Sequence, residues 1–313
     1  MAPPLRPSDF DARFLRRLVG TKVTTIYAID PPQEPSAVSP SAGLPPPASF
    51  TPASHTTASH ATARPTTASS ATAPSLSFPG SPPPGICRSW IIAEKLSERA
   101  VYLTKEEFEM GVGTPMTVGK FLCHLEEGPA HIAFMRIYYQ IPITGTEDAD
   151  LATLVQQIRP PEVCGEREAF RLLMSQKCSA VPRFLGYDES TQGEHDLVPG
   201  GYIKYLVWEK VPGESLTEEF FWSLDLPTRD DIRAKFRVAF EEILRCGVVP
   251  QISRISKIIY DQSTGNVRIS GFRGGWPIHD KLQWSDTRYV AYRLAKQPEE
   301  EWDWRRHPEN WEL

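Results

Sequence analysis

The sequence predicts an α+β domain in which several strands precede one long helix and a β-hairpin. Strand-like runs rich in β-branched and aromatic residues occupy 116–125, 130–139 and 202–211. Apolar residues at helical spacing mark a helix at 228–246. Two further β-branched runs, Lys257–Tyr260 and Val267–Ser270, flank polar turn residues and predict the hairpin.

The remaining elements follow in chain order. Ser8 can cap a helix with Phe10, Phe14 and Leu18 on one face, and 23–29 has the composition of a strand. A helix is expected at 162–175, a strand within 178–187 and a polar loop at 188–201. A capping-box-like start at Thr228 and a stop at Gly247 bound the long helix.

Composition limits the class of protein. The length of 313 residues allows one or two domains, and 40% of the residues are hydrophobic. The net charge of −5 gives no reason to expect a nucleic-acid partner. No apolar run reaches the length of about 18 residues that a membrane span needs. Five cysteines without a CxxC pair favour reduced thiols. We therefore expect an intracellular, cytoplasmic protein without membrane or nucleic-acid partners.

Composition also divides the chain into four segments. Residues 1–30 are expected to form a helix and a strand that pack on the main domain. The segment 31–85 is almost entirely Pro, Ser, Thr and Ala, and it is predicted to be a disordered insertion because it has too little apolar surface to offset its chain entropy. The main domain is assigned to 86–285. The tail 286–313 is acidic and rich in Trp, and with loop 188–201 it is a candidate interaction surface.

The order of elements over about 100–285 resembles the protein-kinase-like fold, specifically compact fungal kinase-like proteins related to aminoglycoside phosphotransferases. Glu168 sits in the helix that carries the Glu of the kinase Lys–Glu pair, and Arg136 sits where the ATP-contacting lysine belongs. The run Val181–Tyr187 resembles the strand after that helix. The run Leu206–Gly213 resembles the hinge, with Trp208 at the gatekeeper position.

This resemblance implies a two-lobed protein-kinase-like fold, with an antiparallel N-lobe sheet at about 86–211 and a reduced helical C-lobe at about 212–285. It also implies a nucleotide cleft formed by Arg136, Glu168, Trp208, Glu209, Val211 and Lys257. Simpler interpretations stay open: Arg136 and Glu168 as a structural salt bridge, Lys257 as a solvated strand-end lysine, and Trp208 as a core residue.

The chain departs from the kinase pattern at the catalytic positions. Laying the catalytic loop on the sequence puts Pro250 at the His, Ile252 at the catalytic Asp and Lys257 at the metal-binding Asn. The metal-binding Asp before Phe272 is replaced by Gly271. A lysine ammonium is only a donor and cannot ligate magnesium. No catalytic residue, no metal site and no Gly-rich phosphate loop is therefore expected.

We expect a catalytically impaired kinase-like protein, a pseudokinase, that acts as a binding or scaffolding module for an unknown protein partner. The alternative is an active phosphotransferase, a protein or small-molecule kinase with noncanonical ATP binding through Arg136, Glu168 and Lys257. A third class is a small-molecule binder that uses the emptied cleft. No cofactor is expected under the first hypothesis. A variant of that hypothesis has the protein bind ATP without a metal.

Overall fold

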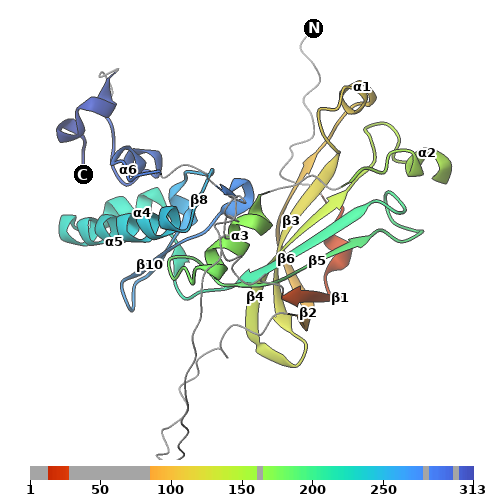
Figure 1. The fold of residues 1–313 in the computed structure, drawn as a ribbon, viewed down its shortest axis with the longest axis horizontal. Coiled ribbons are helices and arrows are strands. Elements are labelled where there is room, and N and C mark those ends of the chain that lie inside the picture. The colour runs from red at the N-terminus through yellow and green to blue at the C-terminus, as the bar shows by residue number, and fades with distance from the viewer. Residues whose placement is uncertain (1–12, 28–84, 161–164, 278–281, 299–302) are drawn as a thin grey trace, which may run out of the picture. The chain divides into compact units, whose positions relative to one another are not determined.

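An antiparallel sheet closes on itself to form a six-stranded barrel in the order β1, β2, β3, β4, β6, β5 (Figure 1). The computed structural model describes residues 13–27, 85–160, 165–277, 282–298 and 303–313. The barrel strands are β1 (Lys22–Tyr27), β2 (Ile86–Val101), β3 (Met116–Leu125), β4 (Gly128–Gln140), β5 (Phe184–Thr191) and β6 (Tyr202–Glu209).

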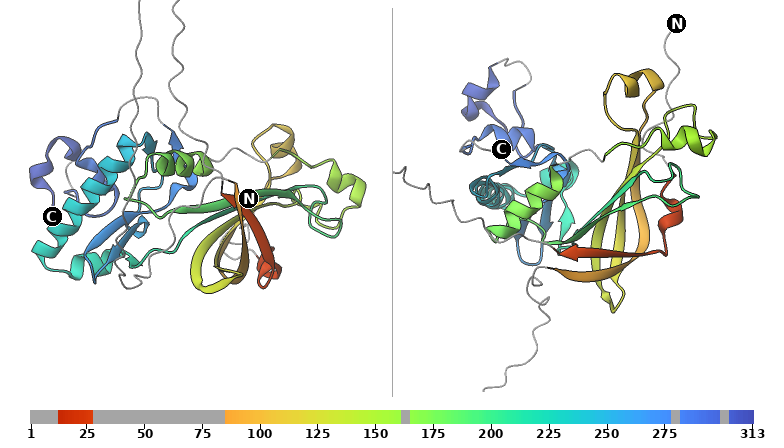
Figure 2. Two further views of the ribbon diagram at one scale, coloured as in Figure 1. Left: turned by 60° about the horizontal axis from the view of Figure 1, so that its bottom comes forward. Right: turned by 45° about the vertical axis from the view of Figure 1, so that its right-hand side comes forward.

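The barrel closes where β1 meets β5. Strand β1, red in Figure 2, pairs with β2 along its full length and with β5 at Ile26 and Tyr187. A Cβ built on Gly186 would lie 2.4 Å from the Thr25 hydroxyl, so only glycine permits this approach of the two backbones. Thr25 in turn accepts a hydrogen bond of 3.0 Å from the Trp90 indole.

The period-two alternation of the strands gives the barrel an inner and an outer face. Inward side chains form one apolar cluster, whose largest members are Trp90, Phe121, Met135, Ile137 and Tyr139. Outward side chains of β3, β4 and β6 belong to a second cluster, shared with the helices that follow: Val118, Tyr138, Leu206 and Trp208. The outer face is therefore also buried over part of its area.

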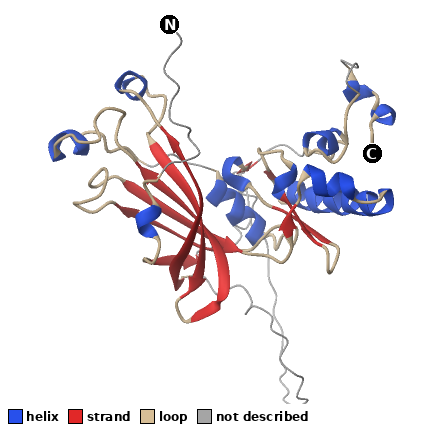
Figure 3. Ribbon diagram, turned by 180° about the vertical axis from the view of Figure 1, so that it is seen from behind, coloured by secondary structure: helices blue, strands red, loops and turns tan. Residues whose placement is uncertain are grey.

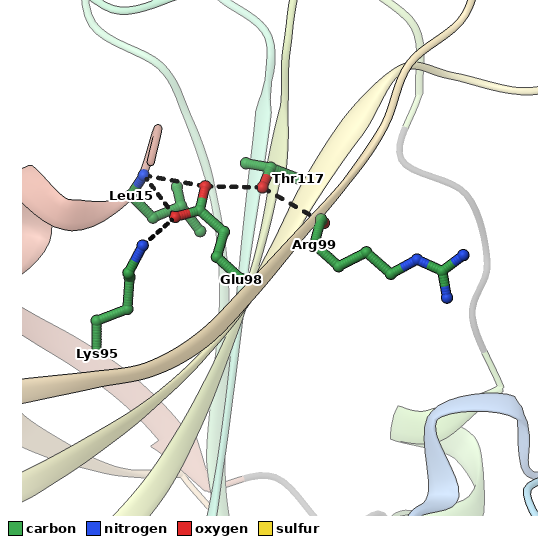
Figure 4. A network of polar contacts seen from close by, with 5 residues as sticks. All are labelled: Leu15, Lys95, Glu98, Arg99 and Thr117. Carbon is green, nitrogen blue, oxygen red and sulfur yellow. Dashed lines mark hydrogen bonds and ion pairs between the residues drawn. The ribbon is translucent and has the colours of Figure 1, made fainter. Parts of the chain in front are cut away.

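The segment before β1 fills one end of the barrel. Leu15 is fully buried, and a Cβ built on Gly119 would lie 2.8 Å from its side chain. The buried carboxylate of Glu98 accepts hydrogen bonds from the Leu15 amide (3.2 Å) and the Thr117 hydroxyl (2.9 Å), and it pairs with Lys95 (2.9 Å) (Figure 4). Glu98 thereby fastens the N-terminal segment to β2 and β3.

The other elements are short except for one helix. The helices are α1 (Lys105–Glu109), α2 (Leu151–Val155), α3 (Glu166–Ser175), α4 (Glu218–Ser223), α5 (Leu226–Arg245) and α6 (Thr287–Ala291). A three-stranded sheet has the order β10 (Asn266–Ile269), β9 (Ile258–Asp261), β7 (Glu214–Ser215), and a two-stranded sheet pairs β11 (Trp276–Pro277) with β8 (Val248–Val249).

Helix α5 begins two residues before the position that the sequence predicts. Asp225 is the N-cap, and its carboxylate accepts a 2.9 Å hydrogen bond from the Thr228 amide. Thr228 therefore lies inside the first turn and is not the cap. Buried Ile232, Phe236 and Phe240 confirm the predicted apolar face.

The predicted two-lobed kinase-like fold is wrong. The sequence interpretation treated 1–30 as a helix and a strand that pack on the main domain, whereas β1 pairs on both sides and closes an antiparallel barrel. Beyond residue 212, α5 is the only long helix in the described part of the chain, and small sheets accompany it instead of a helical lobe (Figure 3). A run of strand signals predicts pairing but does not tell an open sheet from a closed one.

Other local predictions fare better. The strands at 116–125, 130–139 and 202–211 are confirmed as β3, β4 and β6, and the hairpin as β9 and β10. The disordered insertion predicted at 31–85 lies outside the described residues except for its last residue, and the domain boundaries stay predictions. Within the described ranges, the structure contains no helix both long and apolar enough to cross a membrane.

Candidate functional site

Three cations gather where the outer face of the barrel meets the segments after α5. Lys120 on β3 and Arg136 on β4 are direct cross-strand partners and point outward. Lys257 comes from the 3-10 turn Ile255–Lys257 that precedes β9. The positive charges of Arg136 and Lys257 both act on Lys120, and that of Arg136 also acts on Lys257. We call Lys120, Arg136 and Lys257 the cation cluster.

One buried carboxylate faces this cluster. Glu166, in the first turn of α3, is 1% exposed and forms an ion pair with the Arg136 guanidinium. Its other oxygen accepts a hydrogen bond of 2.7 Å from the Tyr138 hydroxyl. Burial alone would lower the pKa of Arg136, but the attraction of Glu166, with Tyr138, outweighs it and raises that pKa, so the guanidinium stays charged.

The predicted pairing of Arg136 with Glu168 is wrong. Glu168 lies two residues after Glu166 on α3, where its partly exposed carboxylate accepts a 2.9 Å hydrogen bond from Arg171. Residues two apart on a helix do not share a face, so Glu166 and Glu168 cannot both reach β4. The salt bridge between helix and sheet therefore exists, but Glu166 makes it.

Lys120 is the member of the cluster whose pKa is lowered most clearly toward neutral pH. Burial, followed by repulsion from Arg136, Lys257 and Lys210, lowers its pKa to about 8. Its ammonium lies 3.8 Å above the centre of the Phe134 ring, a contact that favours the cation. Burial and the neighbouring positive charges both disfavour the charged ammonium at this place.

Lys257 occupies a similar environment. Burial lowers its pKa, with repulsion from Arg136 and Arg254 adding to the effect and Glu166 opposing it. Its aliphatic stem crosses Gly271, on which a Cβ would lie 2.6 Å from the lysine Cδ. Gly271 has φ +92°, a left-handed conformation that favours glycine. The structure thus brings together Lys257 and Gly271, two of the positions singled out in the sequence.

The remaining predicted cleft residues are engaged in packing. Trp208 is 7% exposed, stacks on Phe170 at 6.2 Å and lies 5.0 Å from the Arg136 guanidinium. Glu209 forms a 3.1 Å ion pair with Arg183 at the end of β6. Val211 is 4% exposed. Trp208 therefore lies next to the cation cluster, but its buried ring leaves little surface for a ligand to contact.

None of the positions predicted as degenerate carries a carboxylate, an imidazole or an amide side chain. Pro250 is buried and Ile252 half-buried, between β8 and the 3-10 turn that ends in Lys257. In the described part of the chain, no three His, Cys, Asp or Glu side chains come together in a way that could hold a metal ion. In the tail, Trp311 is buried. Just before the tail, Trp284 packs against Phe236 and Phe240. Neither ring is therefore a free contact surface.

Sequence reasoning missed Lys120, Tyr138 and Glu166. The sequence does indicate Lys120 and Tyr138, because pairing β3 with β4 about the turn that joins them places residues 120, 136 and 138 on one face of the sheet. The signal for Glu166 was weaker, since the first turn of α3 contains two glutamates and only packing selects between them.

Comparisons with known proteins give little further guidance. No protein-family model matches the chain, and no curated protein matches it. Among solved structures, the chain is similar to the structure of the Cydia pomonella granulovirus kinase PK-1, with 10% sequence identity and a TM-score of 0.37. The similarity covers 63% of this chain, which spans about half (55%) of the viral kinase. A similarity this distant carries no argument about function.

Proposed function

We propose that the chain is a binding module that holds a phosphate-bearing ligand at the cation cluster and does not transfer its phosphoryl group. One observation carries the proposal: Lys120, Arg136 and Lys257 lie close enough to repel one another, and the carboxylate that acts on Arg136 and Lys257 is the buried Glu166. Glu166 is already occupied by Arg136 and Tyr138. The two lysines have no ion-pair partner among the described residues.

The charge balance of the cluster supports an anion as its ligand. An anion next to Lys120 would oppose the repulsion that lowers its pKa and would favour the charged ammonium. Phosphate carries up to two negative charges and three acceptor oxygens, and lysine ammoniums bind it as point charges. Partial burial strengthens each of these attractions relative to water.

ATP held without a metal is the specific form of the proposal that we favour. Lys257 and Lys120 would contact phosphate oxygens directly and supply the positive charge that magnesium supplies elsewhere. Trp208 is too buried to receive the adenine ring on its face, so we expect the phosphates to provide most of the affinity. Free pyrophosphate should then compete with ATP.

The residue types near the cluster favour binding over transfer. Phosphoryl transfer needs a group that orients the acceptor hydroxyl and ligands that hold metal ions. Glu166, the carboxylate that acts on Arg136 and Lys257, is already engaged by Arg136 and Tyr138, so it does not serve as such a group. A binding module of this kind would act through a protein partner, which the sequence does not name.

Calorimetric titration with ATP in the presence of EDTA tests the proposal. We expect binding without magnesium, weakened roughly tenfold or more by Lys257→Ala or Lys120→Met, because each removes a charged donor. Lys105→Ala is the matched control, since Lys105 is exposed on α1 and pairs with Glu109. The wild-type titration is repeated with pyrophosphate.

Two results would overturn the proposal. If neither ATP nor pyrophosphate binds with or without magnesium, the cluster is a structural feature. If ATP binds only with magnesium and labelled phosphate passes to an acceptor, the active phosphotransferase becomes the better description.

A further inference from the structure

A groove of about 420 Å³ runs between helix α5 and strand β10, away from the cation cluster. Ala234, Val238 and Glu242 line it from the helix, and Val267 and Arg268 line it from the strand. The loop after α3 closes one end with Ser179 and Ala180. The groove exists because α5 presents alanines to β10 where larger side chains would fill the space.

Strand β10 is an edge strand whose backbone faces this groove. It pairs with β9 alone in the sheet order β10, β9, β7. Ser270 donates its amide to the Lys257 carbonyl across the ladder at 2.8 Å, while Ile269 donates outward to the Ala180 carbonyl at 2.8 Å. Inward and outward residues alternate in an antiparallel ladder, so the amide and carbonyl of Val267 also point outward.

The bond between Ile269 and Ala180 shows that this edge accepts another backbone beside it. It is a single contact at the end of β10, and the groove continues from there past Val267. Val238 is 63% exposed and forms an apolar wall opposite the strand. An unpaired edge beside an apolar wall is the geometry that binds extended peptides by strand addition.

The charge of the groove selects among peptides. Arg268 has no ion-pair partner among the described residues. Lys235, which also lines the groove, pairs with Asp231 of the same helix at 2.7 Å. The Glu242 carboxylate is used internally, because the amide and hydroxyl of Ser179 both donate to it. Of the charged side chains that line the groove, Lys235 and Arg268 are positive and Glu242 is negative, so the lining carries a net positive charge.

We propose that an extended, acidic peptide segment of a partner protein adds to β10 as a fourth strand and lies in the groove against α5. Its backbone pairs with the amide and carbonyl of Val267. An apolar side chain of the peptide rests on Val238, and an acidic one reaches Arg268. The proposal is independent of the cation cluster, so either can fail without the other.

The test is a titration of the full chain, isotope-labelled for NMR, with the synthetic peptide Ac-EVTVE-amide and with its basic counterpart Ac-KVTVK-amide. We expect the acidic peptide to slow hydrogen exchange of the Val267 amide at least roughly tenfold and to shift the resonances of Val238, because strand addition protects an edge amide. The basic peptide should bind at least roughly tenfold more weakly.

Variants identify the surface. Val238→Glu places a like charge on the groove wall and should weaken the acidic peptide roughly tenfold, as should Arg268→Glu. Leu226→Glu is the matched control, since Leu226 is 49% exposed at the start of the same helix and does not line the groove. These surface substitutions leave the core intact, and the NMR spectrum of each variant reports its folding.

The proposal is overturned if the acidic peptide fails to bind at about 1 mM, the weak end of measurable affinities. It is equally overturned if the peptide binds while exchange of the Val267 amide stays unchanged, or if Val238→Glu and Leu226→Glu weaken binding alike. Preferential binding of the basic peptide would contradict the assigned charge.

Discussion

Arg136 and Glu166 form a buried ion pair that joins barrel strand β4 to the first turn of helix α3. The pair is extended by Tyr138, which donates to the second carboxylate oxygen, and by the Trp208 ring, which lies 5.0 Å from the guanidinium. The same arginine repels Lys120 and Lys257. One residue therefore connects the packing of the helix on the barrel with the charge of the candidate site.

Replacing Glu166 should destabilise the fold far more than replacing Glu168. Glu166→Gln leaves the buried Arg136 charge without compensation, which costs about 3 kcal/mol of unfolding free energy. Glu168→Gln removes only a half-exposed pair with Arg171 and should cost less than about 1 kcal/mol. Urea denaturation of the two variants measures both values. Equal losses would show that the Arg136–Glu166 pair does not hold α3 to the barrel.

Stability should rise with pH through the titration of Lys120. Its folded pKa is about 8 and its ordinary value 10.5, so between these values the unfolded chain binds more protons and increasing pH favours folding. The variant Lys120→Met has no charged group to bury and should be more stable than the wild type near pH 7. Because the variant lacks the pH dependence, this difference in unfolding free energy should shrink between about pH 7 and about pH 9.5.

Denaturation midpoints of both proteins across that window provide the measurement. Buried Tyr205 and Tyr292, whose pKa values are raised to about 12, act in the opposite direction only at higher pH, where tyrosines of the unfolded chain ionise. A constant difference between the two proteins over the window would mean that Lys120 titrates normally.

Gly271→Ala should displace Lys257 as well as strain the backbone. Its φ of +92° disfavours a Cβ, at a cost of about 1 kcal/mol, and the Cβ would also lie 2.6 Å from the lysine stem. Gly20→Ala is the control, because Gly20 has φ +88° and no atom within 4 Å of an added Cβ. We expect comparable strain in both and reduced ATP affinity only in Gly271→Ala. Calorimetry and thermal melting separate the two effects, and unchanged affinity would place Lys257 outside the ligand site.

The buried carboxylate of Glu98 should prove essential for the N-terminal segment. Glu98→Ala leaves the Leu15 amide and the Thr117 hydroxyl without their acceptor and should cost about 3 kcal/mol. Glu94→Ala, at an exposed position of the same strand, should change stability by less than about 0.5 kcal/mol. Hydrogen exchange at Leu15 should accelerate in the first variant alone, and unaltered exchange there would show that packing suffices to hold the segment.

The local patterns in the sequence predict individual helices and strands well, but they do not predict that the sheet closes into a barrel. Residues 116–125 alternate clearly enough to predict β3, and Phe236 and Phe240 mark the buried face of α5. Nothing in the run 22–27 indicates that it pairs with both β2 and β5, because each pairing depends on residues far along the chain. The wrong choice of Glu168 as the partner of Arg136 has the same origin. Packing, and not spacing in the sequence, decides that Glu166 is the glutamate of α3 that faces the barrel.

The contact between Ile26 and Tyr187 also has a kinetic meaning. It joins positions far apart in the sequence, whereas β3 and β4 meet across a tight turn. Chain entropy must be lost before such a distant pairing returns any stability, so contacts of this kind slow folding. The hairpin of β3 and β4 can therefore form early, and the barrel should be completed last, when the first strand of the chain docks between partners that already exist.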